Sequence, residues 1–285
     1  MIWRFGTRQM SFDRIRTLGV LNVTPDSFSD GGEFRPPAKA IEKALEMEQA
    51  GADVIDVGGE STRPGARPVS EEEEIARILP VIHGIREQTP IPISVDTTKP
   101  AVARRALQEG ADLINDVDGL HVSPEMIEVV KEFGAGIILM HRRGTPETMQ
   151  GLAHYEDVVE EVFEELDRSL QRVRDGGVEM EQIVLDPGIG FAKTPEQNLE
   201  LIARLRRFHA WGRPILVGPS RKSFIGNLTG KNPNERDWGS AAAVALCVAN
   251  GAHLVRVHQV DAMRDVIRVA EAIVSQAKGR DYVRS

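Results

Sequence analysis

Short apolar runs alternate with amphipathic segments along almost the whole chain. Four of these runs share a phrase near their start, a glycine followed by an alanine, at residues 50–59, 109–119, 133–144 and 250–260. A glycine just past the end of a helix commonly adopts the left-handed conformation. Each phrase therefore predicts the end of a helix, a tight turn and a strand.

Four further apolar runs complete a set of eight, at residues 17–22, 91–96, 182–188 and 214–218. All eight are short and nearly unbroken in apolar character, with many β-branched residues. This pattern is typical of parallel strands that are covered on both faces.

Helix-start signals stand in the segments between these runs. Ser123 and Thr194 occupy expected N-cap positions, and each is followed at once by a proline, which favours the first helical position. Ser70 is followed three residues later by Glu73, and Thr194 by Gln197, as in a capping box. The chain therefore alternates predicted strands with predicted helices.

Eight alternating strand and helix units predict a single (β/α)₈ TIM barrel, because parallel strands need right-handed crossover connections. An open, doubly wound sheet is the second candidate, although no Gly-x-Gly-x-x-Gly follows the first strand. Long loops are expected after strands 1 and 2. We expect one domain over residues 1–285, with residues 1–16 as N-terminal decoration and 277–285 as a tail.

The charge balance narrows the range of partners. The chain has 285 residues, a net charge of −8 at pH 7 and a pI near 5.5, which argues against a nucleic-acid or anionic-membrane surface. No run approaches the ~18 apolar residues of a membrane span, and the N-terminus lacks the apolar core of a signal peptide. We therefore expect a cytoplasmic protein with no nucleic-acid or membrane partner.

Residues 239–250 are apolar nearly all round. A helix of this kind is buried either in the barrel shell or in an interface between two copies. Together with the C-terminal helix, this segment predicts a homodimer. The one cysteine, Cys247, lies here, and we expect it to fill the core.

Polar residues stand at the C-terminal ends of the predicted strands, where a TIM barrel carries its chemistry. A buried ring with three carboxylates would be costly unless its members pair or share a ligand. One of the three, Asp56, either caps the next helix or belongs to the ring. The set comprises Asn22, Asp56, Asp96, Asn115, His141, Asp186, Lys222, Arg256 and His258.

The chemistry of this set indicates the class of ligand. A buried carboxylate accepts two parallel N–H bonds from an amidine-like edge, and an asparagine adds one donor and one acceptor. Arginine and histidine near the exit suit an anion such as phosphate. These residues therefore predict a polar heterocycle that carries a phosphorylated arm.

Eight motifs resemble those of the dihydropteroate synthase family, in the same order and over roughly residues 17–260. They read LGVLNVTPDSFSDGG, GADVIDVGGESTRPGA, ISVDTTKPAVA, INDV, MHRRGTPETMQ, DPGIGF, GPSRKSFIG and RVH. The resemblance implies a TIM barrel enzyme of folate biosynthesis. Its reaction condenses 6-hydroxymethyl-7,8-dihydropterin diphosphate with 4-aminobenzoate, giving 7,8-dihydropteroate and diphosphate.

The resemblance also implies roles for individual residues, with Asp96, Lys222 and Arg256 as the catalytic ones. Two others, Met140 and Phe191, either stack on the pterin or simply pack. The implied pterin contacts are Asp96, Asn115, Asp186 and Lys222. The implied diphosphate contacts are Asn22, Thr62, Arg256 and His258, with a Mg²⁺ ion near Asn22. The implied aminobenzoate surroundings are Thr62, Arg63, Pro64, Ser220 and Lys222.

The chain departs from the family pattern at three positions. Ala192 stands where glycine is usual, Pro219 precedes the Ser-Arg-Lys motif, and Gln259 follows His258 where an acid is common. These departures leave the expected contacts in place. Arg221, within the motif, contacts either an anion or a surface carboxylate.

The sequence offers no clear catalytic triad, and the expected reaction needs none. Diphosphate can leave once Arg256, His258 and Mg²⁺ neutralise its charge. Asp96 and Asp186 then stand where an anion would stabilise the cation that forms on the pterin side. We therefore expect a dissociative displacement at the pterin CH₂.

A cation of this kind must be shielded from water, which suggests a role for the two long loops. We expect residues 23–33 and 58–68 to close over the diphosphate as lids do. Phe28 and Pro64 would supply apolar walls for the aminobenzoate pocket.

Two alternatives to this reaction are a pterin-binding methyltransferase module of corrinoid-dependent methyl transfer and a non-catalytic pterin-binding barrel. The Ser-Arg-Lys motif and the two long loops favour the synthase, because methyl transfer has no use for an aminobenzoate pocket.

Overall fold

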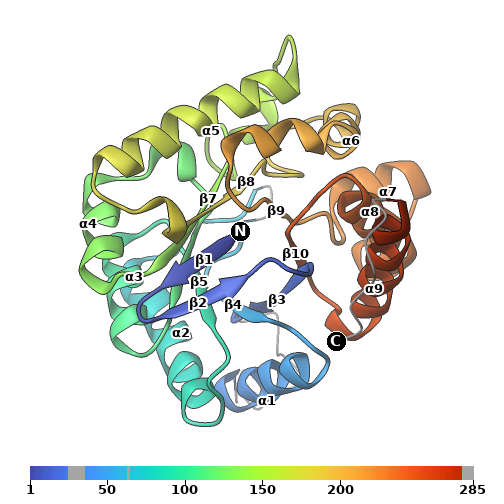
Figure 1. The fold of residues 1–285 in the computed structure, drawn as a ribbon. Helices are drawn as coiled ribbons and strands as arrows, with labels where there is room; N and C mark the ends of the chain where they lie inside the picture. Colours follow the sequence, from blue (N-terminus) through green and yellow to red (C-terminus); the bar gives the residue numbers. More distant parts are fainter. Residues whose placement is uncertain (25–35, 63–64, 278–285) are drawn as a thin grey trace.

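Eight parallel strands form a barrel in the computed structural model, which describes residues 1–24, 36–62 and 65–277 (Figure 1). The order around the sheet is β8-β7-β6-β5-β4-β3-β10-β9, and a parallel bridge between Leu185 and Ile215 joins its two ends. The expected TIM barrel is therefore confirmed. Its strands are β3 (Arg16–Asn22), β4 (Val54–Gly58), β5 (Ile93–Asp96), β6 (Leu113–Asp116), β7 (Gly136–Met140), β8 (Ile183–Asp186), β9 (Leu216–Val217) and β10 (Leu254–Val257).

Helices surround the barrel and cover the outer faces of its strands (Figure 1). Both faces of each strand are thereby buried, which accounts for the unbroken apolar runs in the sequence. The helices are α1 (Pro36–Gln49), α2 (Glu71–Arg86), α3 (Pro100–Gln108), α4 (Pro124–Phe133), α5 (Val158–Asp175), α6 (Pro195–Ala203), α7 (Ser223–Thr229), α8 (Asp237–Ala249) and α9 (Val260–Ala277).

The predicted helix caps are present. The Ser123 side chain accepts from the Met126 N–H at the start of α4, and Thr194 and Gln197 form a full capping box on α6. The Ser70 hydroxyl accepts a hydrogen bond from the Glu73 N–H at the start of α2.

The repeated Gly-Ala phrase has the predicted geometry. Its glycines, Gly51, Gly110, Gly134 and Gly251, have φ angles of 100°, 112°, 61° and 98°. A side chain strongly disfavours this left-handed region, so the glycines let each helix turn directly into the next strand.

A hairpin of β1 (Ile2–Phe5) and β2 (Arg8–Ser11) lies across one end of the barrel, at the centre of Figure 1. Trp3 is completely buried there, and its indole N–H donates to the Gln182 carbonyl oxygen at 2.9 Å. Residues 1–16 are expected from the sequence to be decoration, but the hairpin joins a cluster of inward-facing strand residues. That cluster contains Leu18, Val54, Leu113, Ile138, Val184, Leu216 and Leu254.

None of the helices in the described ranges is both long enough and apolar enough to cross a membrane. Cys247, on α8, is completely buried, as predicted.

Trp3→Ala should lower the free energy of unfolding by about 3–5 kcal/mol, because it empties a large fully buried site and leaves the Gln182 carbonyl without its donor. Urea denaturation followed by circular dichroism measures this change. Ile2→Ala, at a neighbouring exposed position, is the control and should have little effect. A Trp3→Ala protein as stable as the parent would show that the hairpin is a mere appendage.

Candidate functional site

The strand register places several predicted site residues at one level of the barrel. Asn22 on β3 pairs with Gly58 on β4, Gly58 with Asp96 on β5, and Asp96 with Asn115 on β6. The side chains of Asp96 and Asn22 both approach Gly58, since a Cβ there would be in ordinary contact with them, 3.5 Å from the Asp96 Cβ and 3.9 Å from the Asn22 Oδ1. Residues far apart in sequence thus share the C-terminal mouth of the barrel.

Arg256, on β10, reaches across the barrel to two carboxylates. Its Nε donates to the Asp56 Oδ2 at 2.7 Å, and its Nη2 donates to the Asp96 Oδ2 at 2.8 Å. The Asp56 Oδ2 also accepts from the Asn115 side-chain amide at 3.1 Å. Asp56, Asp96, Asn115 and Arg256 therefore form one connected group.

Asp56 holds this group together, a role that the sequence left open between the ring and a helix cap. Its side chain is completely buried and orients both Arg256 and Asn115. The sequence feature that points to Asp56 as a site residue is its place on β4. It stands two residues before Gly58 and hence on the same face of the strand. Asp56 is a member of the ring, and the structure gives no side-chain cap bond from it to α2, which Ser70 caps.

Two carboxylate oxygens of the group lack a partner among the described residues. These are the buried Oδ1 atoms of Asp56 and Asp96. Burial raises the pKa of Asp96 to about 7, Arg256 opposes the shift, and the charges of Asp56 and Glu74 add to it. Buried acceptors without donors are uncommon in proteins, so these atoms mark a place where a ligand with N–H groups would fit.

Asp186, at the end of β8, is a third buried carboxylate at the mouth. Its Oδ1 accepts from the Gly188 N–H at 2.7 Å. Burial raises the pKa of Asp186 to about 6, while the Gly188 N–H and the charge of Lys222 oppose the shift. At neutral pH this carboxylate is therefore largely ionised and can accept hydrogen bonds.

Lys222 lies just before α7 with its ammonium group directed at an aromatic ring. Nζ is 3.8 Å from the centroid of the Phe191 ring, and no carboxylate of the described residues pairs with it. Gly190 gives the side chain room, because a Cβ there would come within 2.7 Å of the Lys222 Cδ. Burial and the nearby Arg256 lower the pKa of Lys222 to about 7.

Met140 and Phe191 are buried in a small apolar cluster at the same end of the barrel. Val117, Met149 and Ala192 complete it. Met140 pairs in register with Asp186, and Phe191 faces Lys222. Both predicted residues therefore border the carboxylates and the lysine, although packing alone also accounts for their burial.

Ser220 and His258, expected near the aminobenzoate and near the diphosphate respectively, contact each other in the structure. The Ser220 Oγ and the His258 Nδ1 are 3.0 Å apart. Between Ser220 and Lys222, Arg221 turns outward and pairs with Asp237 on α8, with Nε 3.0 Å from the carboxylate. Of the two readings for Arg221, the structure gives the carboxylate contact.

Ala192 adopts a φ of 49°, in the left-handed region. An alanine is strained there and a glycine is not, which gives a physical reason for the glycine that the family resemblance implies at this position. The Tyr155 hydroxyl donates to the Ala192 carbonyl oxygen at 3.0 Å and helps to hold the strained turn.

Some of the predicted residues cannot be placed. Arg63, Pro64 and the loop segment 25–35, which includes Phe28, lie outside the described residues. Thr62 is described and is partly exposed after β4. The expected closure of the two loops therefore stays a prediction.

A metal ion at this mouth would find few protein ligands. Within the described ranges, no group of three or more His, Cys, Asp or Glu side chains is arranged to hold one. The Asn22 side chain is partly exposed at the end of β3 and makes no hydrogen bond to the described residues. A free carboxamide oxygen fits Mg²⁺, which keeps several waters and is usually held through one or two protein oxygens together with substrate phosphates.

Comparison with known proteins agrees with this geometry. Residues 18–258 match the model of the pterin-binding enzyme family. The dihydropteroate synthase of Synechocystis sp. is 50% identical over 261 residues, covering 91% of this chain and 90% of that protein.

Solved structures are similar over the same extent. The Xanthomonas albilineans dihydropteroate synthase with 4-aminobenzoic acid superimposes with a TM-score of 0.88 at 43% identity, covering 93% of this chain and 95% of that chain. The same enzyme in complex with 7,8-dihydropteroate gives a TM-score of 0.87 at 39% identity, covering 96% and 98%.

Asp56→Asn should lower the pKa of Asp96 below its value of about 7, because it removes a neighbouring negative charge. Carbon-13 NMR titration of the aspartate carboxyl groups measures this pKa. Asp237→Asn, which alters a carboxylate paired with Arg221 on α8, is the control and should leave Asp96 unchanged. An unchanged or higher pKa in Asp56→Asn would contradict the coupling of the two carboxylates.

Proposed function

The chain belongs to the pterin-binding enzymes, and within them to the dihydropteroate synthases, and on this premise we propose how its residues carry out the reaction. It is a transferase of folate biosynthesis that moves a pterinylmethyl group from diphosphate to the amino nitrogen of 4-aminobenzoate. The products are 7,8-dihydropteroate and diphosphate. The observation that carries the assignment is the group of Asp56, Asp96 and Arg256 at the barrel mouth, inside a chain matched almost end to end by this family.

The pterin ring lies among the buried carboxylates. Its pyrimidine edge offers adjacent N–H donors and a carbonyl acceptor. Asp186 accepts from that edge, and Asn115, fixed by Asp56, supplies one further donor and acceptor. The unpartnered Oδ1 of Asp96 accepts from a ring N–H on the other side. Lys222 directs its ammonium toward a carbonyl oxygen or ring nitrogen.

The diphosphate lies toward the exit of the barrel. Arg256 uses Nε and Nη2 on the two carboxylates, so the N–H groups of Nη1 are left for the anion. We assign Ser220 and His258, which contact each other, to the same anion, together with Thr62 from the loop after β4. The donors thus surround a position where negative charge develops as diphosphate leaves.

We assign Mg²⁺ to the Asn22 carboxamide oxygen, with the diphosphate supplying further ligands. When bound, the ion neutralises charge on the leaving group. Asn22 holds this position because β3 ends there, beside Gly58. The protein would contribute the Asn22 oxygen, and the diphosphate and water would supply the remaining ligands.

The displacement is dissociative. The bond between the CH₂ carbon and the diphosphate oxygen breaks first, and both electrons leave with the diphosphate. The resulting cation is delocalised into the electron-rich dihydropterin ring, where the charges of Asp96 and Asp186 stabilise it. The lone pair of the arylamine then forms the C–N bond, and the nitrogen releases one proton to diphosphate or water.

Two copies of the chain pair through α8 and α9, which pack against each other. Several large apolar side chains on these helices are exposed in the single chain, including Trp238 at 89% and Ile273 at 65%. Leu246 on α8 and Val269 on α9 are also exposed, at 57% and 61%. A patch of this kind typically marks an interface, and a two-fold pair would bury it on both copies.

The direct test of the assignment is diphosphate release by the purified protein. Release should need both 6-hydroxymethyl-7,8-dihydropterin diphosphate and 4-aminobenzoate, and removal of Mg²⁺ by EDTA should suppress it. Detection of 7,8-dihydropteroate by mass spectrometry completes the test. Folded protein that forms no dihydropteroate under these conditions would refute the function.

Lys222→Ala should lower turnover by at least ~10²-fold, about 2.7 kcal/mol of transition-state stabilisation, because it removes the cation that faces the pterin. Steady-state kinetics on folded protein measure the loss. The control is Lys43→Ala, which removes an exposed lysine paired with Glu46 on α1 and should leave turnover unchanged. Near-normal turnover in Lys222→Ala would remove this residue from the site.

Ile273→Glu should convert the protein from dimer to monomer, since a two-fold interface would bring two unpaired charges together in an apolar contact. Light scattering at micromolar concentration reports the mass. Leu199→Glu, at an exposed leucine on α6, serves as the control and should stay dimeric. A parent protein that is already monomeric would disprove the interface.

A further inference from the structure

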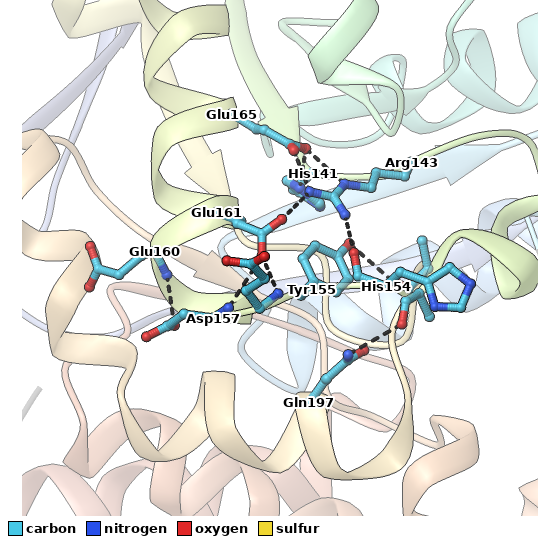
Figure 2. Close-up of polar contacts among 12 residues, drawn as sticks. His141, Arg143, His154, Tyr155, Asp157, Glu160, Glu161, Glu165 and Gln197 are labelled. Atoms are coloured by element: carbon cyan, nitrogen blue, oxygen red, sulfur yellow. Dashed lines mark hydrogen bonds and ion pairs between the residues drawn. The ribbon is translucent and has the colours of Figure 1, made fainter.

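His141, just after β7, belongs to a second polar group at the barrel mouth. The group comprises His141, Arg143, Glu165 and Lys193. The His141 ring is completely buried, with Nε2 3.0 Å from the Glu165 Oε2 on α5 and Nδ1 3.1 Å from the Lys193 Nζ. Figure 2 shows His141, Glu165 and Arg143 converging between the end of β7 and α5. The reaction described above gives this group no role.

The direction of each hydrogen bond follows from the charges. Burial and the adjacent Lys193 lower the pKa of His141 to about 3, so the imidazole is neutral. Burial opposes ionisation of Glu165, but bonds from His141 and Arg143 lower the pKa of this carboxyl to about 2. An ionised Glu165 can only accept, so the His141 Nε2–H donates to it. The Nδ1 lone pair is then left to accept from Lys193.

The outer end of the group is anchored at the surface. The Arg143 Nη2 donates to the Glu161 Oε2 at 2.8 Å, and Nη1 donates to the His154 carbonyl oxygen at 2.6 Å. The guanidinium carbon lies 3.9 Å from the centroid of the Tyr155 ring. These contacts, visible in Figure 2, fix Arg143 and through it Glu165.

The inner end reaches the pterin side of the barrel. The Lys193 Nζ donates to the Phe191 carbonyl oxygen at 2.9 Å, and the side chain is almost completely buried. Residues 186–193 begin at Asp186, include Phe191 and end at Lys193. The turn at Gly188 is held tightly against β7, because a Cβ there would lie 1.9 Å from the His141 carbonyl oxygen. Lys193 therefore ties the end of this turn to the His141 ring. At its start, the Asp186 carbonyl oxygen accepts from the His141 N–H at 2.9 Å.

We propose that Lys193 and His141 are positioning residues for the pterin: they fix segment 186–193, and the Lys193 ammonium helps to keep Asp186 an ionised acceptor. The inference rests on the proposed function, because it assumes that Asp186 binds the pterin. The charges of Lys222 and Lys193 both favour ionisation of Asp186. Burial lowers the pKa of Lys193 to about 7, so its ammonium is present at pH 6.

Other groups around Asp186 do not replace this contribution. Its own turn supplies only the Gly188 N–H, and Arg256 on β10 is already shared between Asp56 and Asp96. Cys247, on α8, interacts with Asp186 but stays a neutral thiol, because burial raises its pKa to about 12. Loss of Lys193 would therefore leave Lys222 as the main cation that acts on Asp186.

The expected effect depends on pH with a definite sign. Without Lys193 the pKa of Asp186 rises above its value of about 6. A rise of one unit would reduce the ionised fraction at pH 6 from about one half to about one tenth, so pterin affinity would fall about fivefold. At pH 8.5 Asp186 is ionised in both proteins, and the difference should nearly vanish.

Calorimetric binding of 6-hydroxymethylpterin at pH 6 and pH 8.5 tests the proposal on Lys193→Met. Lys131→Met, which alters an exposed lysine paired with Glu128 on α4, is the matched control and should behave as the parent at both pH values. An equal loss of affinity at both pH values would mean a purely structural role for Lys193, and an unchanged affinity would exclude any role. A parent protein that does not bind the pterin would instead refute the proposed function.

A pair of His141 variants keeps the proposal testable if Lys193→Met does not fold. Asparagine offers an acceptor near the place of Nδ1, and glutamine offers a donor near the place of Nε2. His141→Asn should therefore keep the Lys193 contact and most of the pterin affinity at pH 6, whereas His141→Gln should lose several-fold. The reverse ranking, or equal affinities, would overturn the assignment of Nδ1 as the acceptor for Lys193.

Discussion

Arg256 is held between Asp56 and Asp96 at the centre of the barrel mouth, and the rest of the site depends on this arrangement. A buried carboxylate without a partner is very unfavourable, and so is a buried guanidinium. The three charged side chains can be buried only together. Asn115 binds the same oxygen of Asp56, so its orientation is set by the same contact. The remaining free oxygens then point to where a ligand must supply donors.

The packing of the barrel offsets the cost in folding stability of burying these charges at its mouth. The apolar shell and the hairpin around Trp3 stabilise the opposite end, which has no part in the chemistry. The mouth carries carboxyl groups with raised pKa values, a strained Ala192 and a lysine directed at an aromatic ring. Such features oppose stability in the free protein, and they are typical of sites that become satisfied only when substrate binds.

The strands, the caps and the polar strand ends follow from the sequence, because these depend on local periodicity and on rules for parallel strands. Which polar side chains pair does not follow from it. Asp56 lies within β4 and His141 just after β7, yet nothing local tells that Asp56 joins Arg256 while His141 joins Glu165 and Lys193. That choice depends on helices and strands more than 20 residues away in sequence, and no local pattern contains it.

The central claim is that these paired charges let diphosphate leave before the arylamine bonds to carbon. Positional isotope exchange tests it most directly, using pterin diphosphate with oxygen-18 at the bridge to the CH₂. If the cation forms first, substrate recovered during turnover should carry part of the label in non-bridging positions, because the departed diphosphate can rotate and recombine. Label that stays entirely at the bridge while dihydropteroate accumulates would contradict the account and favour direct attack by the arylamine.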